Sequence, residues 1–134
     1  ARPAPLLLLA LGLGCSGIHG HRDDVNLRML EPVPIHAQEG KPLQLRCVSS
    51  KEDFGVFWIH QDKAGTLHFI VFISSSITFA GKQQASQRYA AWKNDKSFWL
   101  KVNSFQPQDE GNYFCVANIN RQLYFSPGQP AFLP

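Results

Sequence analysis

Cysteine and histidine are the side chains of this sequence best suited to do chemistry, and it has three of the first and five of the second. In an oxidising compartment Cys47 and Cys115 could form one disulfide. His60 and His68 lie on neighbouring predicted strands, a geometry that permits two metal ligands. No third ligand is evident from the spacing. We therefore interpret both as partly buried histidines, and no metal or cofactor is expected.

Other catalytic motifs are absent from the sequence. It has no strand-to-helix Gly-x-Ser-x-Gly elbow, no phosphate-binding loop and no metal-ligand motif, so we predict that it is not an enzyme. The sequence has thirteen Lys and Arg and ten Asp and Glu, which gives a net charge of +3, and it has no run of consecutive Lys or Arg residues. Because phosphate binding needs clustered cations, this balance argues against a nucleic-acid partner.

The N-terminus is typical of a secretory signal. Arg2 precedes an apolar run over 6–13 and then small residues, so residues 1–20 are predicted to be a cleaved signal peptide and 21–134 one extracellular domain. The run is too short to span a bilayer, and no other stretch approaches eighteen apolar residues. No membrane contact by this segment is expected, and an anchor is expected beyond Pro134.

The elements that carry these residues are predicted to be strands. Apolar Leu43, Leu45 and Cys47 alternate with polar residues, which is the period of a strand. Two runs, 56–59 and 67–73, are apolar on both faces, and turn residues between them indicate an antiparallel hairpin.

A register can be proposed for that hairpin. Placing Gln61 opposite Leu67 sets Ile59 opposite Phe69 on one face. It sets two pairs on the other face, Trp58 with Ile70 and His60 with His68.

One constellation specifies the fold. Trp58 lies eleven residues after Cys47, and Cys115 follows Asp109 and Tyr113. This spacing matches an immunoglobulin variable-type β-sandwich: two antiparallel sheets in a Greek key, joined by one disulfide on which the tryptophan packs. The disulfide would restrict the unfolded chain by about 4 kcal/mol on an entropic model.

Further residues support the variable type. The Tyr113 hydroxyl is expected to tie the corner before the last cysteine, and Arg88 is expected to pair with Asp109. The separation of the two cysteines leaves room for an additional strand pair around 67–73, which favours variable-type over constant-type topology.

From about Gly40 onward the sequence resembles the family of T-cell co-receptor alpha chains that bind class I MHC. The likeness is strongest in Tyr-Phe-Cys at 113–115, Leu-Tyr-Phe-Ser at 123–126 and Ala-Phe-Leu-Pro at 131–134. Antigen-receptor variable domains usually carry Phe-Gly-x-Gly where this chain has Phe-Ser-Pro-Gly at 125–128. That departure counts against an antigen-receptor chain.

The resemblance implies that two such domains pair through the sheet of Trp58 and Cys115, as a homodimer or with a beta chain. Strand alternation independently predicts that five residues of this sheet face away from the core and form the dimer interface: Ile59, Gln61, Phe69, Phe114 and Phe125. In a two-fold dimer the Gln61 amides of both subunits could bond each other.

The resemblance also implies contacts with class I MHC. The third loop, over 118–122, would contribute Asn120 and Arg121, and the second would contribute Phe72, Ser74 and Ser75. A first loop is expected over 49–54, and Arg28 lies near an expected N-terminal basic contact.

The sequence as a whole predicts a non-enzymatic binding domain on the extracellular side of the plasma membrane. The function implied by the resemblance is that of a dimeric co-receptor alpha chain that binds the membrane-proximal domain of class I MHC and supports T-cell recognition and signalling. Two alternatives are another variable-type receptor, adhesive or inhibitory, and an antigen-receptor-like chain.

Overall fold

Two β-sheets form the described part of the protein, and all their strand pairs are antiparallel except one at the edge of the second sheet. The computed structural model describes residues 26–29, 35–50, 55–81 and 85–134. The predicted signal peptide and residues 51–54 of the expected first loop lie outside these ranges. In the described part of the chain, no helix is long and apolar enough to cross a membrane.

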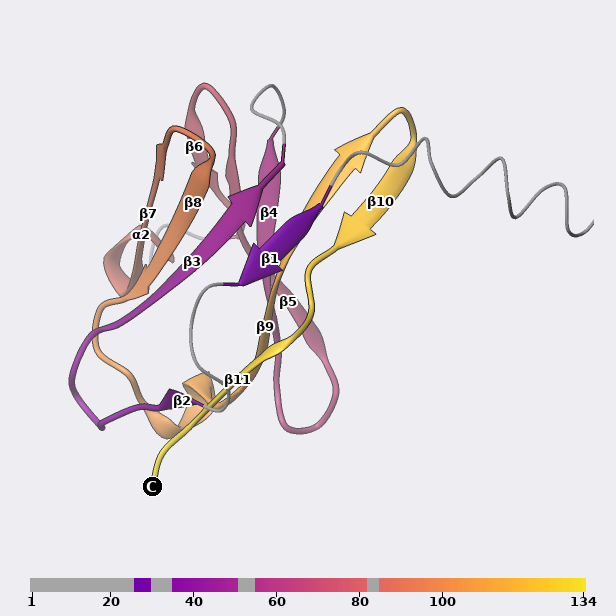
Figure 1. The fold of residues 1–134 in the computed structure, drawn as a ribbon. Coiled ribbons are helices and arrows are strands. Elements are labelled where there is room, and N and C mark those ends of the chain that lie inside the picture. The colour runs from indigo at the N-terminus through magenta and orange to yellow at the C-terminus, as the bar shows by residue number, and fades with distance from the viewer. Residues whose placement is uncertain (1–25, 30–34, 51–54, 82–84) are drawn as a thin grey trace, which may run out of the picture.

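Figure 1 shows the two sheets face to face. The first has the order β1-β3-β8-β7: Leu27–Met29, Leu43–Ser49, Ser97–Val102 and Tyr89–Asn94. The second has the order β2-β11-β9-β4-β5-β6: Ile35–His36, Gln129–Phe132, Gly111–Ile119, Val56–Gln61, Leu67–Ile73 and Ile77–Phe79. Strand β10 (Gln122–Phe125) also pairs with β9.

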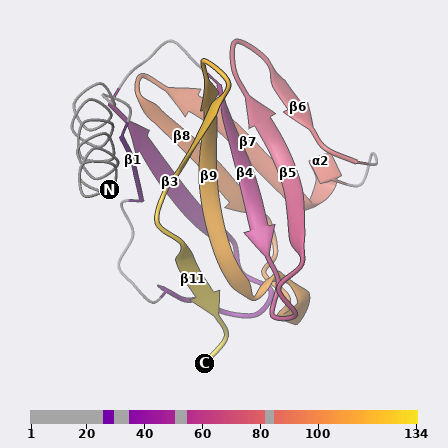
Figure 2. The same cartoon turned by 90° about the vertical axis from the view of Figure 1, so that its right-hand side faces the viewer.

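Helical structure in the described part is limited to two single turns, α2 (Ala85–Arg88) and η1 (Pro107–Asp109). Strands β5 and β6 extend the second sheet beyond β4, and Figure 2 shows them at its edge. These are the additional strands of a variable-type sandwich, so the predicted fold class is confirmed.

The core joins the inner faces of both sheets. Cys47 on β3 and Cys115 on β9 form the predicted disulfide, with Cα atoms 6.4 Å apart. Trp58 is fully buried in the same apolar cluster and is the register partner of Cys115. The Cys-Trp-Cys constellation therefore holds the two layers together as its spacing predicted.

The corner at η1 is also as predicted. The Tyr113 hydroxyl donates a hydrogen bond of 2.6 Å to the backbone oxygen of Asp109, and Arg88 Nη2 lies 2.5 Å from Asp109 Oδ1. Asp109 Oδ2 accepts the backbone N–H of Gln106, so both oxygens of this buried carboxylate are paired. Burial and the nearby Asp109 raise the pKa of Tyr113, which keeps its hydroxyl a donor.

The hairpin register is confirmed at one end and wrong at the other. Gln61, His60 and Ile59 face Leu67, His68 and Phe69 as predicted. Trp58, however, pairs with Val71 and not with Ile70, because a β-bulge lies between Trp58 and Ile59. The bulge leaves one extra residue on β5, Ile70, and the side chain of Ile70 is buried in the core.

Candidate functional site

The outer face of the second sheet carries exposed apolar side chains. Four of them are more than half exposed: Leu67 (53%), Phe69 (55%), Leu123 (58%) and Phe125 (58%). They come from β5 and β10, which lie on opposite sides of the central pair β4 and β9. We call this surface, together with half-buried Phe57, Phe72 and Phe114, the apolar face. Exposed apolar side chains gathered on one sheet face are typical of a protein interface.

Aromatic contacts order part of the apolar face. Phe57 packs edge-on against Phe69, with ring centroids 5.6 Å apart, and lies 4.5 Å from the ring of Phe72. The ring of Phe114 lies beside Gly128, where a Cβ would come within 2.9 Å of it. The rings of Phe57, Phe69 and Phe72 therefore form one aromatic cluster on this face.

One predicted interface residue is not exposed. Ile59 retains only 4% of its accessible surface and is not part of the main core cluster. Its register partners on the two sides are Phe69 and Phe114, and Phe69 leans toward Phe57 on the same strand as Ile59. The larger aromatic side chains therefore cover Ile59, and the expectation that it is exposed is wrong.

The other four predicted interface residues retain accessible surface on the second sheet, as strand alternation predicts for side chains that face away from the core. Phe69 and Phe125 are exposed, Phe114 and Gln61 are half-buried, and all four are on strands of the second sheet. Gln61 makes a long hydrogen bond, 3.5 Å, from Nε2 to the backbone oxygen of Gly65. Sequence reasoning missed Leu67 and Leu123. Both could have been found by the same period-two rule, because Leu67 faces Gln61 and Leu123 lies two residues before Phe125.

The β9–β10 turn and the β5–β6 turn lie at the same end of the sandwich, as Figures 1 and 2 show. We call them the turn end. Between β9 and β10 the turn is tight: Ile119 pairs with Gln122, and only Asn120 and Arg121 lie between. Both have positive φ, 53° and 65°, which is the conformation of a type I′ hairpin turn. The third loop is thus two residues long, and it exposes the Arg121 side chain at its tip.

The β5–β6 turn holds the second group of predicted contacts. The backbone N–H of Ser74 donates to the oxygen of Ser76, and Ser75 is exposed between them. Phe72 is half-buried against Phe57, so its ring belongs to the apolar face as well as to the start of this turn.

Arg28 lies on the other sheet. It is exposed on β1, opposite Val48 on β3, and borders a cavity of about 190 Å³ that Asn26, Ser49 and Ser50 also line. The structure therefore brings Asn120, Arg121, Ser74 and Ser75 to one end of one sheet, and it places Arg28 on a strand of the opposite layer.

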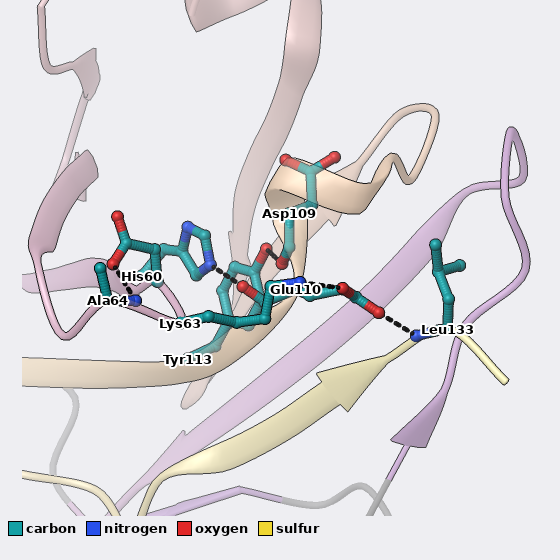
Figure 3. A network of polar contacts seen from close by, with 8 residues as sticks. His60, Lys63, Ala64, Asp109, Glu110, Tyr113 and Leu133 are labelled. Atoms are coloured by element: carbon teal, nitrogen blue, oxygen red, sulfur yellow. Dashed lines mark hydrogen bonds and ion pairs between the residues drawn. The ribbon is translucent and has the colours of Figure 1, made fainter.

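A polar network occupies the far end of the second sheet (Figure 3). The Glu110 carboxylate accepts hydrogen bonds from Lys63 Nζ and from the backbone N–H of Leu133, each 2.8 Å long. These bonds lower the pKa of Glu110. The backbone oxygen of Glu110 lies 2.8 Å from His60 Nε2. One residue therefore connects the β4–β5 turn to the segment that follows β11.

His60 is buried and its ring stacks on that of Tyr113, with centroids 4.6 Å apart. Burial lowers its pKa below the ordinary value of 6.5, against the opposing effect of the bond to Glu110. Among the described residues, no group of three or more His, Cys, Asp or Glu is arranged to hold a metal ion.

Comparison with known proteins identifies the fold's relatives. The profile of the immunoglobulin V-set domain matches residues 30–130. Over 107 residues the chain is 28% identical to the T-cell surface glycoprotein CD8 alpha chain of rat and 30% identical to that of mouse. These matches cover 77% and 74% of this chain but 45% and 43% of the relatives, so the chain spans less than half their length.

A solved structure is similar as well. The crystal structure of the swine CD8aa homodimer matches 81% of this chain and 97% of its own, with a TM-score of 0.72 and 28% identity. The variable region 34 of the human T cell receptor alpha chain is 28% identical over 89 residues, covering 65% of this chain and 76% of the relative. The likeness to CD8 alpha chains extends over more of this chain.

Proposed function

Because the chain belongs to the immunoglobulin V-set family and is similar to CD8 alpha chains over most of its length, we propose that it is the ligand-binding ectodomain of a T-cell co-receptor alpha chain. It acts on the extracellular side of the plasma membrane, without catalysis. It pairs with a second copy of itself or with a related beta chain, and the pair binds class I MHC.

The apolar face is the observation that carries the proposal. Four side chains that are more than half exposed on one sheet face give a free monomer unfavourable contact with water. The solved relative with the same fold is described as a homodimer. Association through this face removes that apolar surface from water, and it leaves the turn end free to bind a ligand.

Self-association is tested by sedimentation equilibrium of residues 21–134 at micromolar concentration. We expect a mass close to that of two chains. A monomer that persists under these conditions contradicts pairing between identical chains. Co-expression with a candidate beta chain then decides whether the apolar face needs a different partner.

The turn end supplies the groups for ligand recognition. Arg121 projects from a two-residue turn, and a guanidinium can engage acidic or amide groups with two parallel hydrogen bonds. Asn120 precedes it, and Ser74 and Ser75 lie on the neighbouring turn. These polar groups are suited to bind an acidic loop of the membrane-proximal MHC domain.

Surface plasmon resonance over class I MHC of the matched species tests this step. The control is an MHC variant altered in its acidic membrane-proximal loop. We expect weak, saturable binding that the variant loses. Absence of binding to both, up to about a millimolar, contradicts the ligand and leaves another V-set receptor as the function.

An antigen-receptor-like chain is the alternative that the T cell receptor relatives suggest. The segment after β10 argues against it. Ser126 replaces the first glycine of the antigen-receptor motif, and its side chain is used: Oγ accepts the N–H of Cys115 at 3.0 Å and donates to the oxygen of Pro127. A glycine here would remove both bonds.

A further inference from the structure

A polar hollow lies between the β4–β5 hairpin and the corner at η1. It has a volume of about 300 Å³ and is lined by His60, Asp62, His68, Arg88, Tyr89, Gln108 and Asp109. This hollow is not part of the apolar face or of the turn end, and neither part of the proposed function uses it.

We propose that His60 and His68 bind one late first-row divalent metal ion, such as Zn²⁺ or Cu²⁺, through the Nδ1 atom of each ring. The two residues are direct cross-strand partners on β4 and β5. Their ring centroids lie 5.8 Å apart. At a metal–nitrogen distance of about 2.1 Å, two imidazoles that share an ion have centroids roughly 5 to 6.5 Å apart. The observed separation falls in this range.

Hydrogen bonds at the opposite ring nitrogens favour ligation through Nδ1. His60 Nε2 lies 2.8 Å from the backbone oxygen of Glu110 (Figure 3), and His68 Nε2 lies 2.8 Å from Asp62 Oδ2. Both partners only accept, so each Nε2 carries a hydrogen, and in its neutral form each ring has its lone pair on Nδ1. A histidine that binds metal usually donates its other N–H to a carbonyl or carboxylate, as here.

Neighbouring carboxylates do not complete the site. Asp62 Oδ1 accepts the backbone N–H groups of Ala64 and Thr66, and Asp109 is bound to Arg88. The ion would therefore have two protein nitrogens and water in its remaining positions. Imidazole ligands suit Cu²⁺ and Zn²⁺, and we expect Cu²⁺ to bind more tightly. The sequence-based interpretation is of two partly buried histidines without a metal; His60 is buried, His68 is exposed, and the proposed site departs from that interpretation.

The test uses protein made without a histidine tag and with His21 changed to alanine, because a histidine near the N-terminus can itself bind Cu²⁺. Two readouts are taken: the shift of the melting temperature with added Zn²⁺, and the electron paramagnetic resonance spectrum with one equivalent of Cu²⁺. We expect a Zn²⁺-dependent rise in melting temperature and nitrogen hyperfine structure from two imidazoles.

His68→Gln should weaken binding at least tenfold and leave nitrogen from one imidazole at most. His68 is exposed, so this variant should fold, and circular dichroism checks it. The matched control is His36→Gln, an exposed histidine on β2, which should change neither readout. The proposal is overturned by metal binding that survives His68→Gln, by loss of binding in His36→Gln, or by absence of binding to the parent protein.

Discussion

At the scale of single residues, the tip of the β9–β10 turn has two notable properties. Its backbone adopts positive φ, which costs free energy, and its Arg121 side chain is charged and exposed. Asn120 tolerates positive φ, whereas the left-handed region costs other residues with a Cβ about 1 kcal/mol or more. Arg121 has a φ of 65° and so carries this cost. Strained backbone residues cluster at functional sites, so this strain supports a role of the Arg121 side chain in ligand binding.

Arg121→Gly separates the two effects. Glycine relieves the backbone, so the free energy of unfolding should rise by about 1 kcal/mol. The loss of the guanidinium should weaken class I MHC binding by about 1 to 3 kcal/mol, if it is a central anchor. Urea unfolding measures the first quantity and surface plasmon resonance the second.

Asp95→Gly is the matched control, because Asp95 has a φ of 61° in the β7–β8 turn on the other sheet. Aspartate, like asparagine, tolerates the left-handed region, so this variant should change stability little, and it should leave binding unchanged. Unchanged affinity in Arg121→Gly would remove Arg121 from the ligand site.

At the scale of elements, the start of β9 requires glycine. Gly111 has a φ of 138°, and a Cβ there would come within 2.2 Å of the backbone oxygen of Gln61 on β4. Strand β4 lies between β9 and β5 in the sheet that bears the apolar face. A side chain at 111 would push apart two central strands of this sheet.

Gly111→Ala should therefore lower the free energy of unfolding by at least about 2 kcal/mol. Gly65→Ala is its control: Gly65 also has positive φ, 93°, but nothing lies within 4 Å of its Cβ position. This variant should lose only about 1 kcal/mol of backbone strain. Equal losses in urea unfolding would mean that the close approach to Gln61 has no effect.

The β4–β5 hairpin should make stability depend on pH. Burial lowers the pKa of His60 below 6.5 in the folded state, so the unfolded chain binds its proton more tightly. The stabilisation is complete above pH 6.5, and it is lost as pH falls through the lowered pKa. Asp62 and Glu110, whose pKa values lie below 3.8 and 4.5, titrate outside this window.

Urea unfolding between pH 7.5 and 5, in buffer with a chelator, measures this dependence. The free energy of unfolding should fall toward pH 5 in the parent protein, and the fall should be smaller in His60→Gln. His36→Gln should keep it in full. An identical pH slope in His60→Gln would show that another group is responsible.

At the scale of the whole molecule, the apolar face and the turn end are two separate surfaces of the second sheet: the first is its outer face and the second is one of its ends. Phe125 is 58% exposed and lies on β10, the strand that also leads away from Arg121. Self-association and ligand binding should therefore be separable by substitution, although both surfaces involve the same hairpin.

Phe125→Asp should convert a dimer to monomers, because it places a charge where apolar surface would be desolvated. Gln44→Asp adds the same charge on an exposed position of the other sheet, and it should remain a dimer. Sedimentation equilibrium measures both variants. A Phe125→Asp dimer as tight as the parent would place the interface elsewhere.

Much of this architecture follows from local rules. Alternation at Leu43, Leu45 and Cys47 predicted β3, and the spacing of Trp58 between the cysteines predicted the disulfide-linked sandwich. The pairs Arg88–Asp109 and Tyr113–Asp109 also form as predicted. These features could be predicted because strand period and the fixed reach of a side chain are properties of the chain itself.

Other features depend on how the layers pack. The bulge pairs Trp58 with Val71, and Ile70 is buried in the core; the period-two pattern of the sequence carries no signal for a bulge. The burial of Ile59 depends on the size and direction of the rings around it.

The sequence by itself determined the fold class, the disulfide, the corner and which residues alternate toward solvent, because each depends on residue type and spacing along one chain. Only the tertiary structure decided which outward side chains are exposed, that Arg28 lies on the opposite layer from Arg121, and that His60 and His68 have acceptors at Nε2. Exposure and hydrogen-bond partners are set by neighbours distant in sequence, and those neighbours exist only once the two sheets have packed.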